Sequence, residues 1–157
     1  TLAALNYIQK DDVLVASVSG HQSCAAAGDQ VMGMLKNCGG AGFVTDGPMR
    51  DYAGLVEVGL PAWCTGLTPA SPFTQGPATV GLPINIGGQK IESGDVIVAD
   101  RDGVVVVPHS KIDFVIARLS QVADLEYSLD AEVRGGLKIP DPVKEMILDD
   151  NVKFVDD

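Results

Sequence analysis

Two apolar segments of strand length, separated by one helical segment, constrain the fold more than any other feature of the sequence. Residues 13–18 and 41–45 are mostly apolar and lie next to charged or glycine-rich turns. Between them, residues 29–36 carry apolar side chains at helical spacing, and Gly39-Gly40 would end that helix. This order predicts a parallel βαβ unit whose strands are buried on both faces, with their carboxyl ends at one edge of a sheet.

The residues best suited to bind a ligand directly follow these two strands. Gly28 and Asp29 stand where the helix begins, and Arg50-Asp51 comes after the turn at residues 46–48. Ligands of open α/β sheets bind outside the carboxyl ends of the strands. We therefore expect both groups of residues to converge on one site.

This group of residues suits an anion and a hard divalent metal. The guanidinium of Arg50 can bind a carboxylate through two hydrogen bonds, and the free backbone N–H groups of Gln30 and Val31 add donors at the helix start. Asp51 is a candidate ligand for Mg²⁺ or Mn²⁺, which need only one or two carboxylates and several waters. Asp29 could hold a metal-bound water or act as a base. A simpler interpretation stays open, in which Arg50-Asp51 is a solvated turn and Asp29 only caps the helix.

The remainder of the chain predicts an α/β fold with parallel and antiparallel strands and flanking helices. A short helix at residues 52–58 and a third strand at 62–65 precede a loop at 66–76, which is either a plain surface connection or a wall of the site. A long amphipathic helix at residues 111–133 and a short helix from Pro142 end the chain. Between the loop and the long helix, hairpin signals predict short strands at residues 78–80, 84–86, 90–91, 96–99 and 104–107.

The start of the chain has the pattern of an interrupted element. Residues 2–8 look like the back half of an amphipathic helix, and the chain begins at Thr1 without a methionine. We therefore expect residues 1–157 to form one domain that lacks its N-terminal part.

Charge and composition exclude several classes of protein. The formal net charge of −10 and a sequence pI of about 4.4 argue against nucleic-acid binding and against an anionic membrane surface. No apolar run approaches the roughly 20 residues of a membrane span.

Three cysteines without CxxC spacing predict small, buried, reduced thiols in a cytoplasmic protein. His21 and His109 lack metal-ligand spacing, which argues against a histidine-based zinc site.

Two motifs in this order resemble a known family. Asp29-x20-Arg50-Asp51 is embedded in FVTDGPMRD at residues 43–51, and SGDVIVADRDGVVVVP follows at residues 93–108. Together they resemble the RraA-like superfamily, in its branch of 4-hydroxy-4-methyl-2-oxoglutarate aldolases. The resemblance implies a swivelling β/β/α fold and a homotrimer or homohexamer with active sites between subunits. It also implies a divalent metal, Mg²⁺ or Mn²⁺.

The resemblance assigns roles to individual residues. It implies that Asp51 binds the metal and that Asp29 supports metal-bound waters. It places the pyruvoyl part of the substrate against Arg50 and the backbone that follows Gly28, at Gln30 and Val31. A neighbouring subunit would supply an acid from the C-terminal helix, for which Glu126 matches best and Glu132 is the rival.

The activity implied by the resemblance is that of a metal-dependent lyase. Such an enzyme would cleave a small 4-hydroxy-2-keto acid through a pyruvate enolate, with oxaloacetate decarboxylation as a side activity. The main alternative is a non-catalytic regulator of the RraA type that binds a ribonuclease or another protein partner. A related hydrolase or decarboxylase with the same metal centre is a third possibility. Some relatives carry a menaquinone methyltransferase name, but no methyl-donor site is visible in this sequence.

Overall fold

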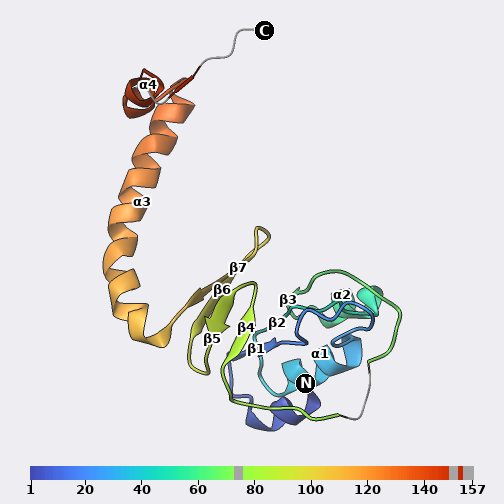
Figure 1. Ribbon diagram of the computed structural model, residues 1–157. Coiled ribbons are helices and arrows are strands. Elements are labelled where there is room, and N and C mark those ends of the chain that lie inside the picture. The colour runs from blue at the N-terminus through green and yellow to red at the C-terminus, as the bar shows by residue number, and fades with distance from the viewer. Residues whose placement is uncertain (73–75, 149–151, 154–157) are drawn as a thin grey trace. The chain divides into compact units, whose positions relative to one another are not determined.

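Strands β1 (Val13–Ala16), β2 (Gly42–Thr45) and β3 (Ala62–Trp63) form a parallel sheet in the order β1-β2-β3 (Figure 1). This is the computed structural model of the chain, and it describes residues 1–72, 76–148 and 152–153. The predicted parallel βαβ unit is therefore confirmed. Only β2 is buried along its whole length, whereas β1 is half-buried because it lies at the sheet edge. The expectation that both strands are fully buried was wrong for β1.

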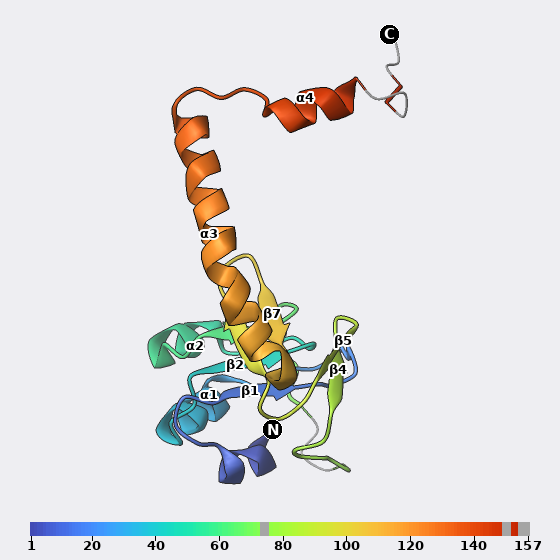
Figure 2. The same ribbon diagram turned by 90° about the vertical axis from the view of Figure 1, so that its left-hand side faces the viewer.

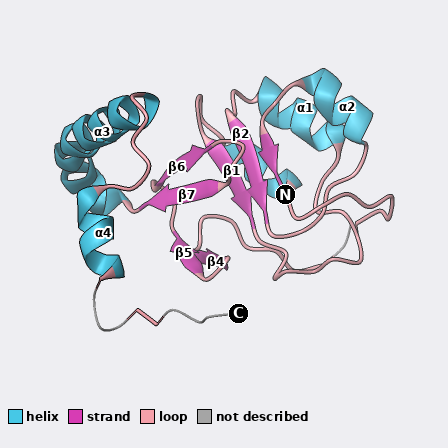
Figure 3. Ribbon diagram, turned by 90° about the horizontal axis from the view of Figure 1, so that it is seen from above, coloured by secondary structure: helices cyan, strands magenta, loops and turns pink. Residues whose placement is uncertain are grey.

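Helices α1 (Asp29–Asn37) and α2 (Tyr52–Val58) pack beside each other against this sheet (Figure 3). The core at their contact contains fully buried Met32, Leu35, Phe43 and Met49. Each such side chain stabilises the fold by about 1.5–3 kcal/mol relative to an exposed position. The segment predicted as an amphipathic helix is instead the 3₁₀ helix η1 (Leu2–Tyr7), from which Leu5 packs on the core.

Two antiparallel hairpins follow the parallel sheet. Strands β4 (Ile84–Ile86) and β5 (Gln89–Ile91) are joined by Gly87-Gly88, which both have positive φ as a two-residue turn requires. Strands β6 (Val96–Ala99) and β7 (Val104–Val107) form the second hairpin. Trp63 Nε1 donates a hydrogen bond of 2.6 Å to the backbone oxygen of Asp100 in the turn of that hairpin, so β3 is fastened to it.

The expected strand at residues 78–80 is not formed, and that prediction was wrong. These residues are exposed, and no strand of the described part of the chain pairs with them. A β-propensity without a hydrogen-bonding partner does not make a strand. The remaining architecture, with parallel and antiparallel sheets and helices, confirms the predicted α/β class.

The chain divides into two compact units, Thr1–Ile112 and Asp113–Asp157. The first ends with the 3₁₀ helix η2 (His109–Lys111). The second contains most of α3 (Ile112–Arg134) and, after a loop, α4 (Asp141–Ile147) (Figure 2). No residue of α3 is buried, and its apolar side chains are exposed by 57% at Leu119 and 72% at Leu125. That the whole chain is one domain stays a prediction.

Two further expectations can be compared with the structure. All three cysteines are free, but Cys38 and Cys64 are exposed and Cys24 is only half-buried, so the prediction of buried thiols was wrong. No helix in the described ranges is long and apolar enough to cross a membrane.

Candidate active site

Three backbone segments that follow β1, β2 and β3 are joined by hydrogen bonds into a second, shorter parallel array. Met49 pairs with Ala27 on one side and with Leu67 on the other. The N–H of Arg50 donates to the oxygen of Ala27 at 3.1 Å, and the N–H of Thr68 donates to the oxygen of Met49 at 2.9 Å. The two ends of the stretch from Gly28 to Asp51 therefore converge at the carboxyl edge of the sheet, as the sequence predicted.

Asp46 fixes the connection between the first two segments. Its carboxylate accepts hydrogen bonds from the N–H of Val18 at 2.6 Å, the N–H of Gly20 at 2.9 Å and the hydroxyl of Ser17 at 2.9 Å. One side chain after β2 thus satisfies the donors of the turn after β1. The sequence marked Asp46 only as part of a turn, and nothing in its spacing indicated this role.

Gly28, Arg50 and Asp51 are in close contact. Arg50 Nε lies 3.1 Å from Asp51 Oδ2, and the two side chains are 34% and 46% exposed. A Cβ atom on Gly28 would lie 2.6 Å from Asp51 Oδ2 and 3.0 Å from Arg50 Cγ. Glycine is therefore required at position 28 for the charged pair to approach the backbone there.

Asp51 occupies a backbone conformation that few residues tolerate. It precedes α2 as the N-cap residue, with φ of 61° and ψ of 47° in the left-handed region. Aspartate and asparagine enter this region more readily than most residues, and such conformations cluster at functional sites. This left-handed backbone conformation determines the direction in which the Asp51 side chain points.

Asp29 is the first residue of α1 and lies against α2. A Cβ atom on Gly54 would lie 2.7 Å from Asp29 Cβ and 2.8 Å from Asp29 Cγ. Asp29 Oδ1 accepts a hydrogen bond of 2.6 Å from the N–H of Gln30. The N–H of Gln30 is therefore not free, contrary to the expectation from sequence. The N–H of Val31 precedes the first backbone hydrogen bond of α1, from Met32 to Gly28, and is the better donor for a ligand.

A hollow of about 250 Å³ lies at this site. Its walls are Arg50, Asp51, Tyr52, Leu67, Thr68 and Pro69. The loop that begins at residue 66 therefore forms a wall of the site, which decides the alternative that the sequence left open. From the same loop, the hydroxyl of Ser71 accepts a hydrogen bond of 2.6 Å from Arg50 Nη1. Sequence analysis missed Ser71, because serine is common in loops of this composition.

The carboxylates at this site suit a metal ion whose ligands are mostly water better than one bound entirely by protein side chains. Among the described residues, no group of three or more His, Cys, Asp or Glu side chains could hold a metal ion. A half-exposed carboxylate at Asp51, with Asp29 packed on the same helix, matches the one or two carboxylates by which Mg²⁺ is held. The residues present therefore fit Mg²⁺ or Mn²⁺ and do not suit structural zinc.

The other candidate residues lie elsewhere. Glu126 and Glu132 are both exposed on α3, in the second compact unit, and their expected part in a neighbouring site stays a prediction. His21 is exposed in the turn after β1. Asp100 Oδ1 accepts hydrogen bonds from the N–H groups of Asp102 and Gly103, so its carboxylate stabilises the β6–β7 turn.

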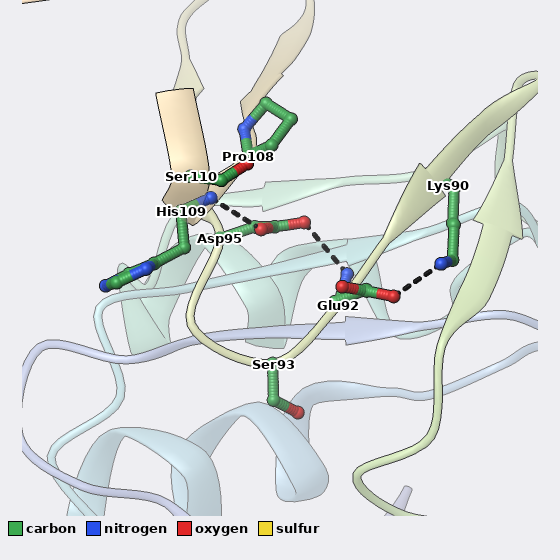
Figure 4. Close-up of a pocket in the computed structure, with 7 residues that line it drawn as sticks. All are labelled: Lys90, Glu92, Ser93, Asp95, Pro108, His109 and Ser110. Carbon is green, nitrogen blue, oxygen red and sulfur yellow. Dashed lines mark hydrogen bonds and ion pairs between the residues drawn. The ribbon is translucent and has the colours of Figure 1, made fainter. Parts of the chain in front are cut away.

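A larger hollow of about 380 Å³ lies between the β5–β6 turn and η2 (Figure 4). Asp95 is at its centre, where Oδ2 accepts from the N–H of Glu92 and Oδ1 from the N–H of His109, both at 2.9 Å. Lys90 forms an ion pair with Glu92. Its acidic groups are thus already bound within the protein, and the smaller hollow at Arg50 is the better candidate for substrate.

The two backbone hydrogen bonds that the Asp95 carboxylate accepts lead to a prediction about stability in acid. The N–H groups of Glu92 and His109 hold the pKa of Asp95 below its usual range. Because the pKa is lower in the folded state, the carboxylate stabilises the fold above its unfolded pKa of about 4, and this contribution is lost as the pH falls further. Thermal unfolding of Asp95→Asn should therefore show a small decrease in Tm at neutral pH, and this difference from wild type should diminish as the pH falls below about 4. Asp102→Asn, in the exposed β6–β7 turn, is the control, and an equal effect of both variants at neutral pH would contradict the prediction.

Comparison with known proteins identifies the family. The family model described as "RraA-like: Aldolase/RraA" matches residues 1–106. The chain is a member of the RraA-like family. Its RraA-like relatives include a Halalkalibacterium halodurans protein named "Putative 4-hydroxy-4-methyl-2-oxoglutarate aldolase", which is 38% identical over 74% of this chain and 56% of its own length. This RraA-like chain thus spans little more than half of that relative.

Solved structures show the same RraA-like fold. A Pseudomonas syringae protein described as uncharacterized has a TM-score of 0.77 at 28% identity, over 85% of this chain and 67% of its own. A Streptomyces coelicolor protein has a TM-score of 0.74 at 36% identity, with the same two coverages. It is described as an unusual member of the RNase ES inhibitor RraA protein family. Relatives with enzyme names and relatives with regulator names therefore both share this fold.

Proposed function

We propose that this protein is a divalent-metal-dependent lyase of the cytoplasm that cleaves 4-hydroxy-2-keto acids of the 4-hydroxy-4-methyl-2-oxoglutarate type. Oxaloacetate decarboxylation is its expected side activity, because that reaction passes through the same pyruvate enolate. The observation that carries the proposal is the contact of Gly28, Arg50 and Asp51 at the carboxyl edge of the parallel sheet. A cation and a carboxylate held together there suit a 2-keto acid and a metal. The names of the aldolase relatives also support it.

In this mechanism Arg50 and the N–H of Val31 bind the carboxylate of the pyruvoyl part. Asp51 would hold Mg²⁺ or Mn²⁺, and such an ion supplies a Lewis acid that polarises the 2-keto oxygen. Asp29, acting through a water, accepts the proton of the C4 hydroxyl. The electrons of the C3–C4 bond then move to C3, which releases a carbonyl product and leaves the enolate of pyruvate beside Arg50. Protonation at C3 gives pyruvate.

The proposal predicts a chelator-sensitive release of pyruvate. With Mg²⁺, the protein should release pyruvate from 4-hydroxy-4-methyl-2-oxoglutarate and from oxaloacetate, and excess EDTA should lower both rates by about 100-fold or more because the Lewis acid is lost. Asp51→Asn should behave like the EDTA sample, since asparagine keeps the left-handed backbone but not the charge. Weaker Mn²⁺ binding by this variant in titration calorimetry would assign the loss to the metal.

Asp102→Asn is the matched control, because it removes an exposed carboxylate from a hairpin turn. Full activity of Asp51→Asn, or a rate insensitive to EDTA, would argue against the proposed metal site. If the protein turns over oxaloacetate but not 4-hydroxy-4-methyl-2-oxoglutarate, the enolate mechanism would stand, and the assigned activity would change from aldolase to decarboxylase.

We further propose a homotrimer or homohexamer in which Glu126, or its rival Glu132, acts as an acid in the site of a neighbouring subunit. The exposed apolar side chains of α3 support an assembly, because large apolar patches of this kind are usually covered by a partner.

The second candidate function is that of a regulator that binds a ribonuclease or another protein partner. The Streptomyces coelicolor relative, described as belonging to an RNase inhibitor family, favours it. Absence of pyruvate release from both substrates by the folded protein, together with binding to a purified ribonuclease, would establish this alternative.

A further inference from the structure

The guanidinium of Arg50 is held at two of its nitrogen atoms. Nε lies 3.1 Å from Asp51 Oδ2, but Nε is buried and this ion pair is not an aligned hydrogen bond. Nη1 donates an aligned hydrogen bond of 2.6 Å to the hydroxyl of Ser71. An arginine side chain has five N–H donors, so these contacts leave others for a carboxylate. Ser71 therefore fixes the plane of the guanidinium in a way that Asp51 alone does not.

The backbone before Ser71 is itself anchored to the site. The N–H of buried Ala25 donates to the oxygen of Ala70 at 3.0 Å, and the N–H of Ala70 donates to the hydroxyl of Thr68 at 3.3 Å. Thr68 is bonded in turn to Met49, the residue before Arg50. The backbone that carries Ser71 is thus hydrogen-bonded both to Ala25 and, through Thr68, to Met49, and this fixes the position of the Ser71 hydroxyl beside Arg50.

We propose that Ser71 is a positioning residue that orients Arg50 to bind the carboxylate of the 2-keto acid. This inference rests on the proposed function, because it assigns the carboxylate to Arg50. Binding a planar carboxylate through two parallel hydrogen bonds requires a defined guanidinium plane. Without the hydroxyl of Ser71, the side chain of Arg50 rotates about its terminal bonds and the two-bond geometry is populated less often.

The expected effect is on binding more than on turnover. For Ser71→Ala, the KM for 4-hydroxy-4-methyl-2-oxoglutarate should rise about 5- to 20-fold, the size expected for loss of a hydrogen bond to a charged group at a partly exposed site, and kcat should change less. Oxalate, a planar dicarboxylate of similar size to the enolate, should bind more weakly by a similar factor in titration calorimetry with Mg²⁺. Ser71→Thr retains the hydroxyl and should restore both values.

A double-mutant cycle separates positioning from a general structural role. Arg50→Lys removes the planar fork, so adding Ser71→Ala to it should change oxalate affinity less than about 2-fold, since contacting residues are not additive. Mn²⁺ affinity should be unchanged in Ser71→Ala, because Asp51 is retained. Ser93→Ala, in the exposed β5–β6 turn, is the matched control and should match wild type.

The outcomes distinguish this inference from the proposed function. Wild-type pyruvate release with an unaltered KM and oxalate affinity in Ser71→Ala would overturn the inference alone. An equally large effect of Ser71→Ala in the Arg50→Lys background would also overturn it, because the serine would then act independently of the arginine. A wild-type protein that neither releases pyruvate nor binds oxalate would overturn the proposed function and this inference with it.

Discussion

Replacing Arg50 with alanine is expected to lower kcat/KM for pyruvate release by about 10²- to 10³-fold, or about 3–4 kcal/mol of transition-state stabilisation. The charge that develops on the enolate lies beside the guanidinium, and the partial burial of Arg50 limits the ability of water to replace it. Steady-state kinetics with both substrates would measure the loss. Arg50→Lys should recover only part of the activity, because lysine retains the charge but not the planar fork.

The control for this experiment is Arg101→Ala. Arg101 lies exposed in the β6–β7 turn, and its removal changes the net charge of the protein equally. Circular dichroism should show that Arg50→Ala remains folded, since Arg50 is not part of the apolar core. Normal turnover by a folded Arg50→Ala variant would falsify the assignment of Arg50 to the substrate.

The largest effect on stability is expected for Asp46→Ala. Its carboxylate satisfies the N–H groups of Val18 and Gly20 and the hydroxyl of Ser17. Removing it leaves the partly buried donors of Ser17 and Val18, and the exposed N–H of Gly20, without their acceptor, which should lower the free energy of unfolding by about 2–4 kcal/mol. Urea unfolding, followed by circular dichroism, would measure the shift of the midpoint.

Asp46→Asn should give an intermediate loss, because the amide keeps one acceptor oxygen and introduces donors where N–H groups already point. Asp102→Ala is the control, for which the change should stay within about 0.5 kcal/mol as for other exposed residues. A midpoint for Asp46→Ala equal to that of the control would show that the turn finds other acceptors.

The sequence was sufficient to predict the elements whose determinants are local. The βαβ unit could be predicted because residues 13–18 and 41–45 are apolar and flank a helical pattern. The hairpin between β4 and β5 followed from Gly87-Gly88, which take the positive φ that this turn requires. The predicted strand at residues 78–80 failed because strand formation depends on a partner, and pairing across the chain is not encoded locally.

The candidate site could be predicted in part for the same reason. Topology brings Gly28 and Arg50-Asp51 to one edge, because both follow parallel strands. The roles of Asp46 and Ser71 depend on contacts across more than 20 residues of chain, 28 between Val18 and Asp46 and 21 between Arg50 and Ser71. Only the folded backbone defines such pairs, so composition and spacing could not reveal them.

The array formed by Ala27, Met49 and Leu67 has a consequence for motion at the site. Backbone amides of Ala26, Arg50 and Thr68 each donate from one loop to the next, so no loop can leave without breaking a bond to its neighbour. Hydrogen exchange of these three amides should give one common free energy of opening, as expected for a single cooperative unit. The entropic cost of ordering the ligand-binding loops would then be incurred during folding, and a small substrate would meet a surface that is already in place.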